Sequence, residues 1–215
     1  MVMTAKQAPK KRATQDEPIY LDDSLLTELN KAIEKTKWPY KTKTEQLWLR
    51  DQACSSIFIL TGFRNSEVGQ GPQTTWGKRL NTETNKREYY KYTPNSYPLK
   101  RKEIRIYPDK LLIPTHQTVK KGNTRKNLEL PKTGGFAPLV TRVENYLNLI
   151  DEQGIMPDQY LFPSANNQGN FRFDFAMSTK RIYWIIRTTT GLFAHYYRAV
   201  NETIFGRTRM GRRCN

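Results

Sequence analysis

The chain has 215 residues, of which 36 are lysine or arginine and 20 are aspartate or glutamate, so its formal net charge is +16. This length suits one domain, and the 37% of hydrophobic and 12% of aromatic residues provide for one core and exclude a disordered chain. No segment approaches the roughly 18–20 apolar residues of a membrane span, and no apolar secretory signal follows Met1.

The excess of positive charge predicts a polyanionic partner, because phosphate backbones neutralise such charge and release counterions. The basic residues run through the whole chain rather than one tail, which favours nucleic acid over a merely soluble basic protein. Cys54 and Cys214 form neither a zinc-binding spacing nor a disulfide framework. We therefore expect an intracellular protein that uses no metal or other cofactor, contacts no membrane and takes no small-molecule substrate.

Two helices are predicted behind a basic, flexible tail at residues 1–17. Residues 18–42 are predicted to form an N-terminal helix and a linker: Leu25, Leu29 and Ile33 recur at helical spacing, and the helix should end near Trp38-Pro39. A second helix is predicted over about residues 44–60, with the Gly of Thr61-Gly62 just past its end.

The middle of the chain predicts a small antiparallel sheet. Residues 104–107 alternate like a strand, and residues 111–113 are expected to pair with them. A hairpin should follow, with arms at 117–121 and 126–130 joined by Gly122-Asn123.

The last third predicts mostly helix. After Pro131 an amphipathic helix carries Leu139, Val143, Leu147 and Ile150 on one face, and residues 160–164 form a short buried stretch. A helix is predicted over 173–186, with Phe175, Ile182, Ile185 and Ile186 as core residues, and another over 194–205. The Arg-rich end, 207–215, reads as turn-like. The predicted class is therefore α+β, mainly helical with a small antiparallel sheet and a β-hairpin.

Four short motifs stand out in chain order. They are TGFRNSE at 61–67, with Arg64 just past a helix end; VKKGNTR at 119–125, with Lys121 at a hairpin tip; YLFPS at 160–164; and HYYR at 195–198, which sets His195 and Arg198 on one helix face. Seen alone, each of the basic motifs has an ordinary structural reading: a surface arginine at a helix end, a solvated hairpin tip, a half-buried histidine.

Taken together, the ordered motifs resemble the catalytic domain of the tyrosine recombinase (phage-type integrase) family over residues 43–206. The resemblance implies metal-free transesterification on double-stranded DNA through a 3′-phosphotyrosyl intermediate. It implies that Arg64 and Arg198 bind the non-bridging phosphate oxygens, that Lys121 (or Lys120, if the hairpin register slips) protonates the leaving 5′-oxygen, and that His195 is a general acid/base. Further DNA contacts are expected from Arg125, Lys100, Arg101 and Lys102.

The chain also departs from that family. Residues 200–215 contain no Tyr, His or Trp, so neither the nucleophile nor the His/Trp position of the family is found after Arg198. The interval from Arg64 to Lys121 is longer than the family's compact sheet, which predicts an insert at about 81–102, rich in Tyr and Lys. This insert would lie along DNA or form a solvent-exposed hairpin.

Three functions remain open at this point. In the first, the chain is a recombinase whose nucleophile lies in a missing C-terminal segment or comes from another chain. Whether such a recombinase acts as an oligomer on DNA stays open. In the second, the chain is a DNA-binding architectural or regulatory protein that kept the fold without the activity. In the third, its charge and tyrosines serve RNA binding.

Overall fold

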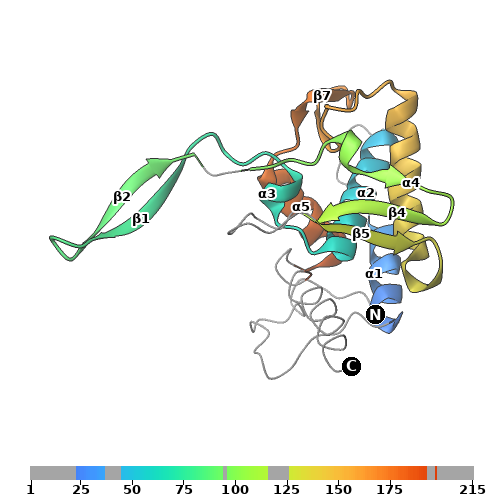
Figure 1. The fold of residues 1–215 in the computed structure, drawn as a ribbon, viewed down its shortest axis with the longest axis horizontal. Helices are drawn as coiled ribbons and strands as arrows, with labels where there is room; N and C mark the ends of the chain where they lie inside the picture. Colours follow the sequence, from blue (N-terminus) through green and yellow to red (C-terminus); the bar gives the residue numbers. More distant parts are fainter. Residues whose placement is uncertain (1–22, 37–44, 94–95, 116–125, 193–196, 198–215) are drawn as a thin grey trace.

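The computed structural model describes residues 23–36, 45–93, 96–115, 126–192 and Tyr197. These residues mix helices with small antiparallel sheets, so the predicted α+β class is confirmed at this coarse level. Within them, no helix combines the length and apolar character needed to cross a bilayer. The helices gather on one side of the molecule with the three-stranded sheet, and one hairpin projects away from them (Figure 1).

Helix α2 (Glu45–Thr61) lies at the centre of the body, between α4 (Ala137–Glu152) and α5 (Thr179–Thr190). Every residue from Arg50 to Leu60 is buried, as expected of a helix covered on all sides. The polar side chain of Ser55 is accommodated by hydrogen bonds with the Asp51 carbonyl and the Thr189 hydroxyl. The predicted position of this helix is confirmed.

Helix α1 (Asp23–Lys35) packs through Leu26, Leu29 and Ile33 into the common core, as its spacing predicts. Arg142 of α4 ties the two helices together, because its guanidinium donates to Asn30 Oδ1 and, at 2.7 Å, to Glu34 Oε1. The predicted end of the helix at Trp38-Pro39 lies outside the described residues.

The three-stranded sheet has the order β3-β4-β5, formed by Arg105–Ile106, Lys110–Thr115 and Lys126–Pro131. Arg105 lies opposite Leu112, so the predicted pairing of residues 104–107 with 111–113 is confirmed. The predicted hairpin register is wrong: β5 pairs with Lys110–Thr115, with Thr115 opposite Lys126. A ten-residue connection joins these strands where the sequence suggested a two-residue turn, and the predicted arm at 117–121 lies outside the described residues.

Helix α4 follows the short 3-10 helix η2 (Gly134–Phe136), with Pro138 in its first turn, where the missing N–H costs nothing. Its predicted inward face is confirmed, since Leu139, Val143, Leu147 and Ile150 are all fully buried. A second 3-10 helix, η1 (Arg101–Glu103), precedes β3.

The helix predicted over residues 173–186 is wrong in its first half. Phe171–Ala176 forms strand β7, which pairs with β6 (Pro163–Ala165). Apolar and polar residues alternate along this strand with period two, which is a strand pattern; Phe175 is 54% exposed and not a core residue. Helix α5 begins after Ser178, whose hydroxyl accepts the Arg181 N–H as an N-cap, and its Ile182, Ile185 and Ile186 are buried as predicted.

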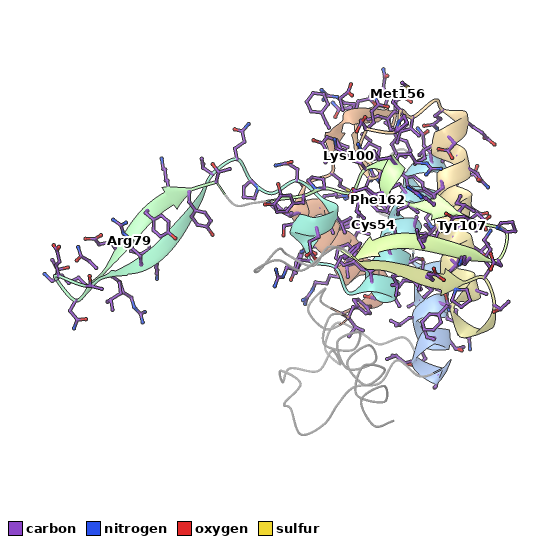
Figure 2. The ribbon with its side chains drawn as sticks, in the orientation of Figure 1. Cys54, Arg79, Lys100, Tyr107, Met156 and Phe162 are labelled. Atoms are coloured by element: carbon purple, nitrogen blue, oxygen red, sulfur yellow. The ribbon has the colours of Figure 1, made fainter. Side chains whose placement is uncertain are left out.

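Strands β1 (Thr75–Asn81) and β2 (Lys86–Tyr92) form a hairpin that extends away from the body (Figure 1). Figure 2 shows Arg79 of this hairpin far from Phe162 and Cys54, which lie within the body. The insert predicted at about 81–102 therefore begins inside this exposed hairpin, and its last residues belong to the body.

The short helix α3 (Asn65–Val68) is docked on the N-terminus of α5. Gln70 N–H donates to the Met177 carbonyl, and Thr179 N–H donates to the Gln70 carbonyl, both at 2.9 Å. A Cβ on Gly69 would lie 2.2 Å from Ile182 Cδ1 and 2.5 Å from the Met177 carbonyl oxygen, so only glycine permits this approach.

We expect Gly69→Ala to destabilise the protein by about 1–3 kcal/mol, because one of the two atoms that its Cβ meets is backbone and cannot swing away. The measurement is the free energy of unfolding from urea titration. Gly77→Ala is the matched control: its Cβ meets only the ring of Tyr90, an exposed side chain free to rotate. Equal losses from the two variants would contradict the close-packing argument.

Candidate functional site

The turn that carries Arg64 is built from the end of α2. Gly62 takes a positive φ of 65° and donates its N–H to the Phe58 carbonyl, which ends the helix. Phe63 is buried, and Arg64 follows with an extended backbone and a half-buried side chain. The chain thus reverses direction at a fixed point, with Arg64 immediately before α3.

Glu67 holds this turn through the backbone of Arg64. Its Oε2 accepts the Arg64 N–H at 2.7 Å, and the Glu67 N–H donates to the Arg64 carbonyl at 2.9 Å. Glu67 is 2% exposed. Its Oε1 and the Oδ1 of Asn65 are buried and accept no hydrogen bond within the part of the chain that the structure describes. The turn therefore holds two buried acceptor atoms within three residues of Arg64 in the sequence.

The YLFPS stretch contacts three other parts of the body, at Leu99, Tyr146 and Met177. The Leu161 N–H donates to the Leu99 carbonyl, and the Leu161 carbonyl accepts the Tyr146 hydroxyl at 2.7 Å. The Phe162 carbonyl accepts the Met177 N–H, and the Phe162 ring stacks on Tyr146 with 5.6 Å between centroids. The predicted short buried stretch is confirmed, and its contacts are those of a structural element.

A buried charged cluster in the first half of α2 was not predicted from the sequence. Asp51 is fully buried; its Oδ1 accepts from Arg50 Nε at 2.8 Å and its Oδ2 from Arg181 Nη2 at 3.2 Å. Arg50 also donates to the Pro163 carbonyl, so the cluster joins α2, β6 and α5. Burial raises the pKa of Asp51 from 3.8 to about 6, although the charge of Arg50 opposes the rise. The signal in the sequence was the Arg50-Asp51 pair, which holds the charged residues that follow Glu45 in this helix.

Lys100, Arg101 and Lys102, predicted to contact DNA, pair with carboxylates of the body. Arg101 makes a two-pronged contact with Asp151, at 2.7 and 2.6 Å. Lys102 and Lys100 both lie near Asp158, at 2.5 and 3.8 Å, and the Lys102 contact lowers the pKa of Asp158. The three cations share these two carboxylates, and Glu103 in the same 3-10 helix adds a third negative charge, so this segment offers little net charge to a polyanion.

Of the predicted catalytic residues, only Arg64 is among the described residues. Lys120, Lys121, Arg125, His195 and Arg198 lie outside them. Residues next to these positions are described. Strand β4, which precedes residues 116–125, has its arrowhead toward α3 and α5 in the view of Figure 1. Tyr197, between His195 and Arg198, is fully buried in the core cluster. Arg64 and Lys100 belong to neighbouring segments, because the Tyr97 N–H donates to the Ser66 carbonyl at 2.8 Å.

In the described ranges no three His, Cys, Asp or Glu side chains come together as metal ligands. Comparisons of the chain with protein-family models, with curated proteins and with solved structures return no match. The site therefore has to be interpreted from its own residues.

The raised pKa of Asp51 predicts a pH dependence of stability. The pKa of Asp51 is higher in the folded state than in the unfolded state. Protonation of Asp51 therefore adds to the free energy of unfolding; this contribution is complete below pH 3.8 and is lost as the pH rises through about 6. A shift of about two units corresponds to about 3 kcal/mol. We expect the difference in unfolding free energy between the wild type and Asp51→Asn to change by up to that amount between pH 7 and pH 4, in favour of the wild type at low pH. Parallel pH profiles for the two proteins would contradict this.

Proposed function

We propose that this protein binds duplex DNA as a tyrosine recombinase-like protein and that Arg64 binds a phosphate of the cleaved or recognised strand. The observation that carries the proposal is the construction of the Arg64 turn. The backbone of Arg64 is held between the end of α2, which is buried from Arg50 to Leu60, and the short helix α3, which is locked to α5. A guanidinium carried on a fixed backbone binds a phosphate well because no backbone freedom remains to be lost on binding.

The order of the motifs along the chain supports the proposal of a tyrosine recombinase-like protein. TGFRNSE, the basic segment 119–125, YLFPS and HYYR occur in this sequence in the order described above for the recombinase family. The three-stranded sheet between the first and third motifs, and the hub-like contacts of YLFPS, are compatible with such a domain. The net charge of +16 supports a phosphate-rich partner.

In the proposed reaction, Arg64 and Arg198 stabilise the charge that grows on the non-bridging oxygens. A tyrosine hydroxyl attacks phosphorus and forms the phosphotyrosyl bond, while the bond to the 5′-oxygen breaks. Lys121 gives its proton to that oxygen, with Lys120 as the alternative donor, and His195 accepts the proton of the attacking hydroxyl. Residues 199–215 contain no tyrosine, so the nucleophile has to come from elsewhere.

That sequence observation favours one second candidate. A DNA-binding protein that keeps the phosphate grip without the nucleophile would act as an architectural or regulatory factor. The two candidates differ in one product: a covalent protein–DNA adduct on a nicked suicide substrate, stable to denaturant, is expected of the recombinase. Duplex binding without any adduct at high protein concentration is expected of the architectural protein.

We expect Arg64→Ala to weaken duplex binding by about 1.5–3 kcal/mol, the usual value of a hydrogen bond to a charged group, which is a loss of roughly 10–150-fold. The measurement is a titration of labelled duplex at fixed salt. Arg105→Ala removes the same charge from an exposed position on β3 and serves as the control. A matching loss in both variants would mean that only delocalised charge matters, and an unchanged affinity in Arg64→Ala would end the assignment of this turn.

A further inference from the structure

The β1–β2 hairpin is built as a defined arm rather than a loose loop. Its seven-residue strands pair without interruption from Thr75 opposite Tyr92 to Asn81 opposite Lys86. At the tip, Asn81 Oδ1 accepts the N–H groups of Glu83 and Thr84, and Asn85 adopts the left-handed conformation with φ of 52°. Asn81 Nδ2 also donates to Glu88 at 2.6 Å. The tip is thus closed by its own hydrogen bonds, without help from the body.

The register divides the arm into two faces of different chemistry. Side chains of successive residues point to opposite faces, and directly paired residues share a face. One face carries Arg79, Glu88, Asn81 and Lys86, and on it Arg79 contacts the Glu88 carboxylate at 3.5 Å. The other face, which we call the acid-free face, carries Lys78, Leu80, Arg87, Tyr89 and Lys91. Within the two strands no acidic residue lies on it.

The acid-free face is open to a partner. Tyr89 is 65% exposed and Leu80 is 56% exposed. Large apolar side chains that lie exposed next to each other often mark a surface that binds a partner. Lys78 Nζ lies 5.0 Å from the centre of the Tyr89 ring, which holds the cation over an aromatic face. Lysine and arginine side chains around an exposed aromatic ring, with no carboxylate on the same face, form a surface that complements a phosphate backbone.

We propose that the β1–β2 hairpin is a DNA-binding arm that lays its acid-free face against the sugar-phosphate backbone of duplex DNA, away from the Arg64 site. The arm has the right dimensions. Two strands about 4.8 Å apart make a ribbon narrower than the major groove, which is about 12 Å wide, so the ribbon can lie along the phosphates at the edge of that groove. Seven residues at about 3.3 Å each extend about 23 Å, or roughly two-thirds of a helical turn of DNA. The proposal rests on DNA being the partner of this protein.

A second copy of the chain is the less favourable occupant. Each copy carries a net charge of +16, so a face whose charged side chains are all cations would meet a partner of like charge. A DNA duplex instead offers one negative charge per about 1.7 Å of its axis and releases counterions when lysine and arginine replace them.

Two double variants of equal charge test the proposal. Lys78→Gln with Arg87→Gln removes two charges from the acid-free face, one on each strand; Arg79→Gln with Lys86→Gln removes two from the opposite face, again one on each strand. The measurement is duplex affinity of the full chain over a series of salt concentrations. We expect the first variant to reduce the slope of log affinity against log salt by about 1.8, two contacts at about 0.9 each, and the second to leave it nearly unchanged.

The outcomes separate the arm from the proposed function. If the wild type binds no duplex, the proposed function fails and the arm proposal fails with it. If the wild type binds and Arg64→Ala weakens it, but the two double variants change the slope equally or not at all, the arm proposal alone is overturned. Sedimentation without DNA tests whether the acid-free face binds a second copy of the chain instead. A change of oligomeric state in the first variant, with an unchanged salt slope for DNA binding, would show that it does and would overturn the arm proposal.

Discussion

The fold depends on one buried carboxylate. Asp51 lies at the centre of α2 with no exposed surface and accepts hydrogen bonds from Arg50, its neighbour on the same helix, and from Arg181 of α5. Removing a charge of this kind from water costs several kcal/mol, and the cost is offset only if the partners are fixed in good geometry. The cluster therefore selects one arrangement of α2, α5 and the Pro163 carbonyl, because any other would leave a guanidinium or a carboxylate buried without its partner.

This constraint is passed to the Arg64 turn through two rigid connections. Helix α2 ends at Thr61, so the position of its axis sets where the Gly62 reversal and Arg64 begin. On the far side of the turn, the close approach at Gly69 and the hydrogen bonds of Gln70 tie α3 to the start of α5. Since α2 and α5 are held by the same buried cluster, the guanidinium-bearing turn is fixed at both ends to one scaffold.

How far the sequence could predict this structure depends on the range of the interactions. The positions of α2 and α4 and the buried residues of the first part of α5 follow from local spacing and were predicted correctly. Residues 173–176 were assigned to the helix predicted over 173–186, although the alternation of residues 171–176 has period two. The pair Asp51–Arg181 joins residues 130 positions apart, and the β4–β5 register spans a ten-residue connection. No local pattern contains either contact, so neither could be found from the sequence.

The described body and the arm differ in how far their cations are balanced by carboxylates. In the described body, cations pair repeatedly with carboxylates: Arg101 with Asp151, Lys102 with Asp158, Lys132 with Glu144. The arm, residues 75–92, has five lysines or arginines and only two glutamates. A paired cation gains little from a phosphate because it must give up a carboxylate first, whereas an unbalanced one gains the full counterion release. If DNA is the partner, as proposed, the arm adds delocalised charge to the affinity, and the Arg64 turn selects which phosphate is held.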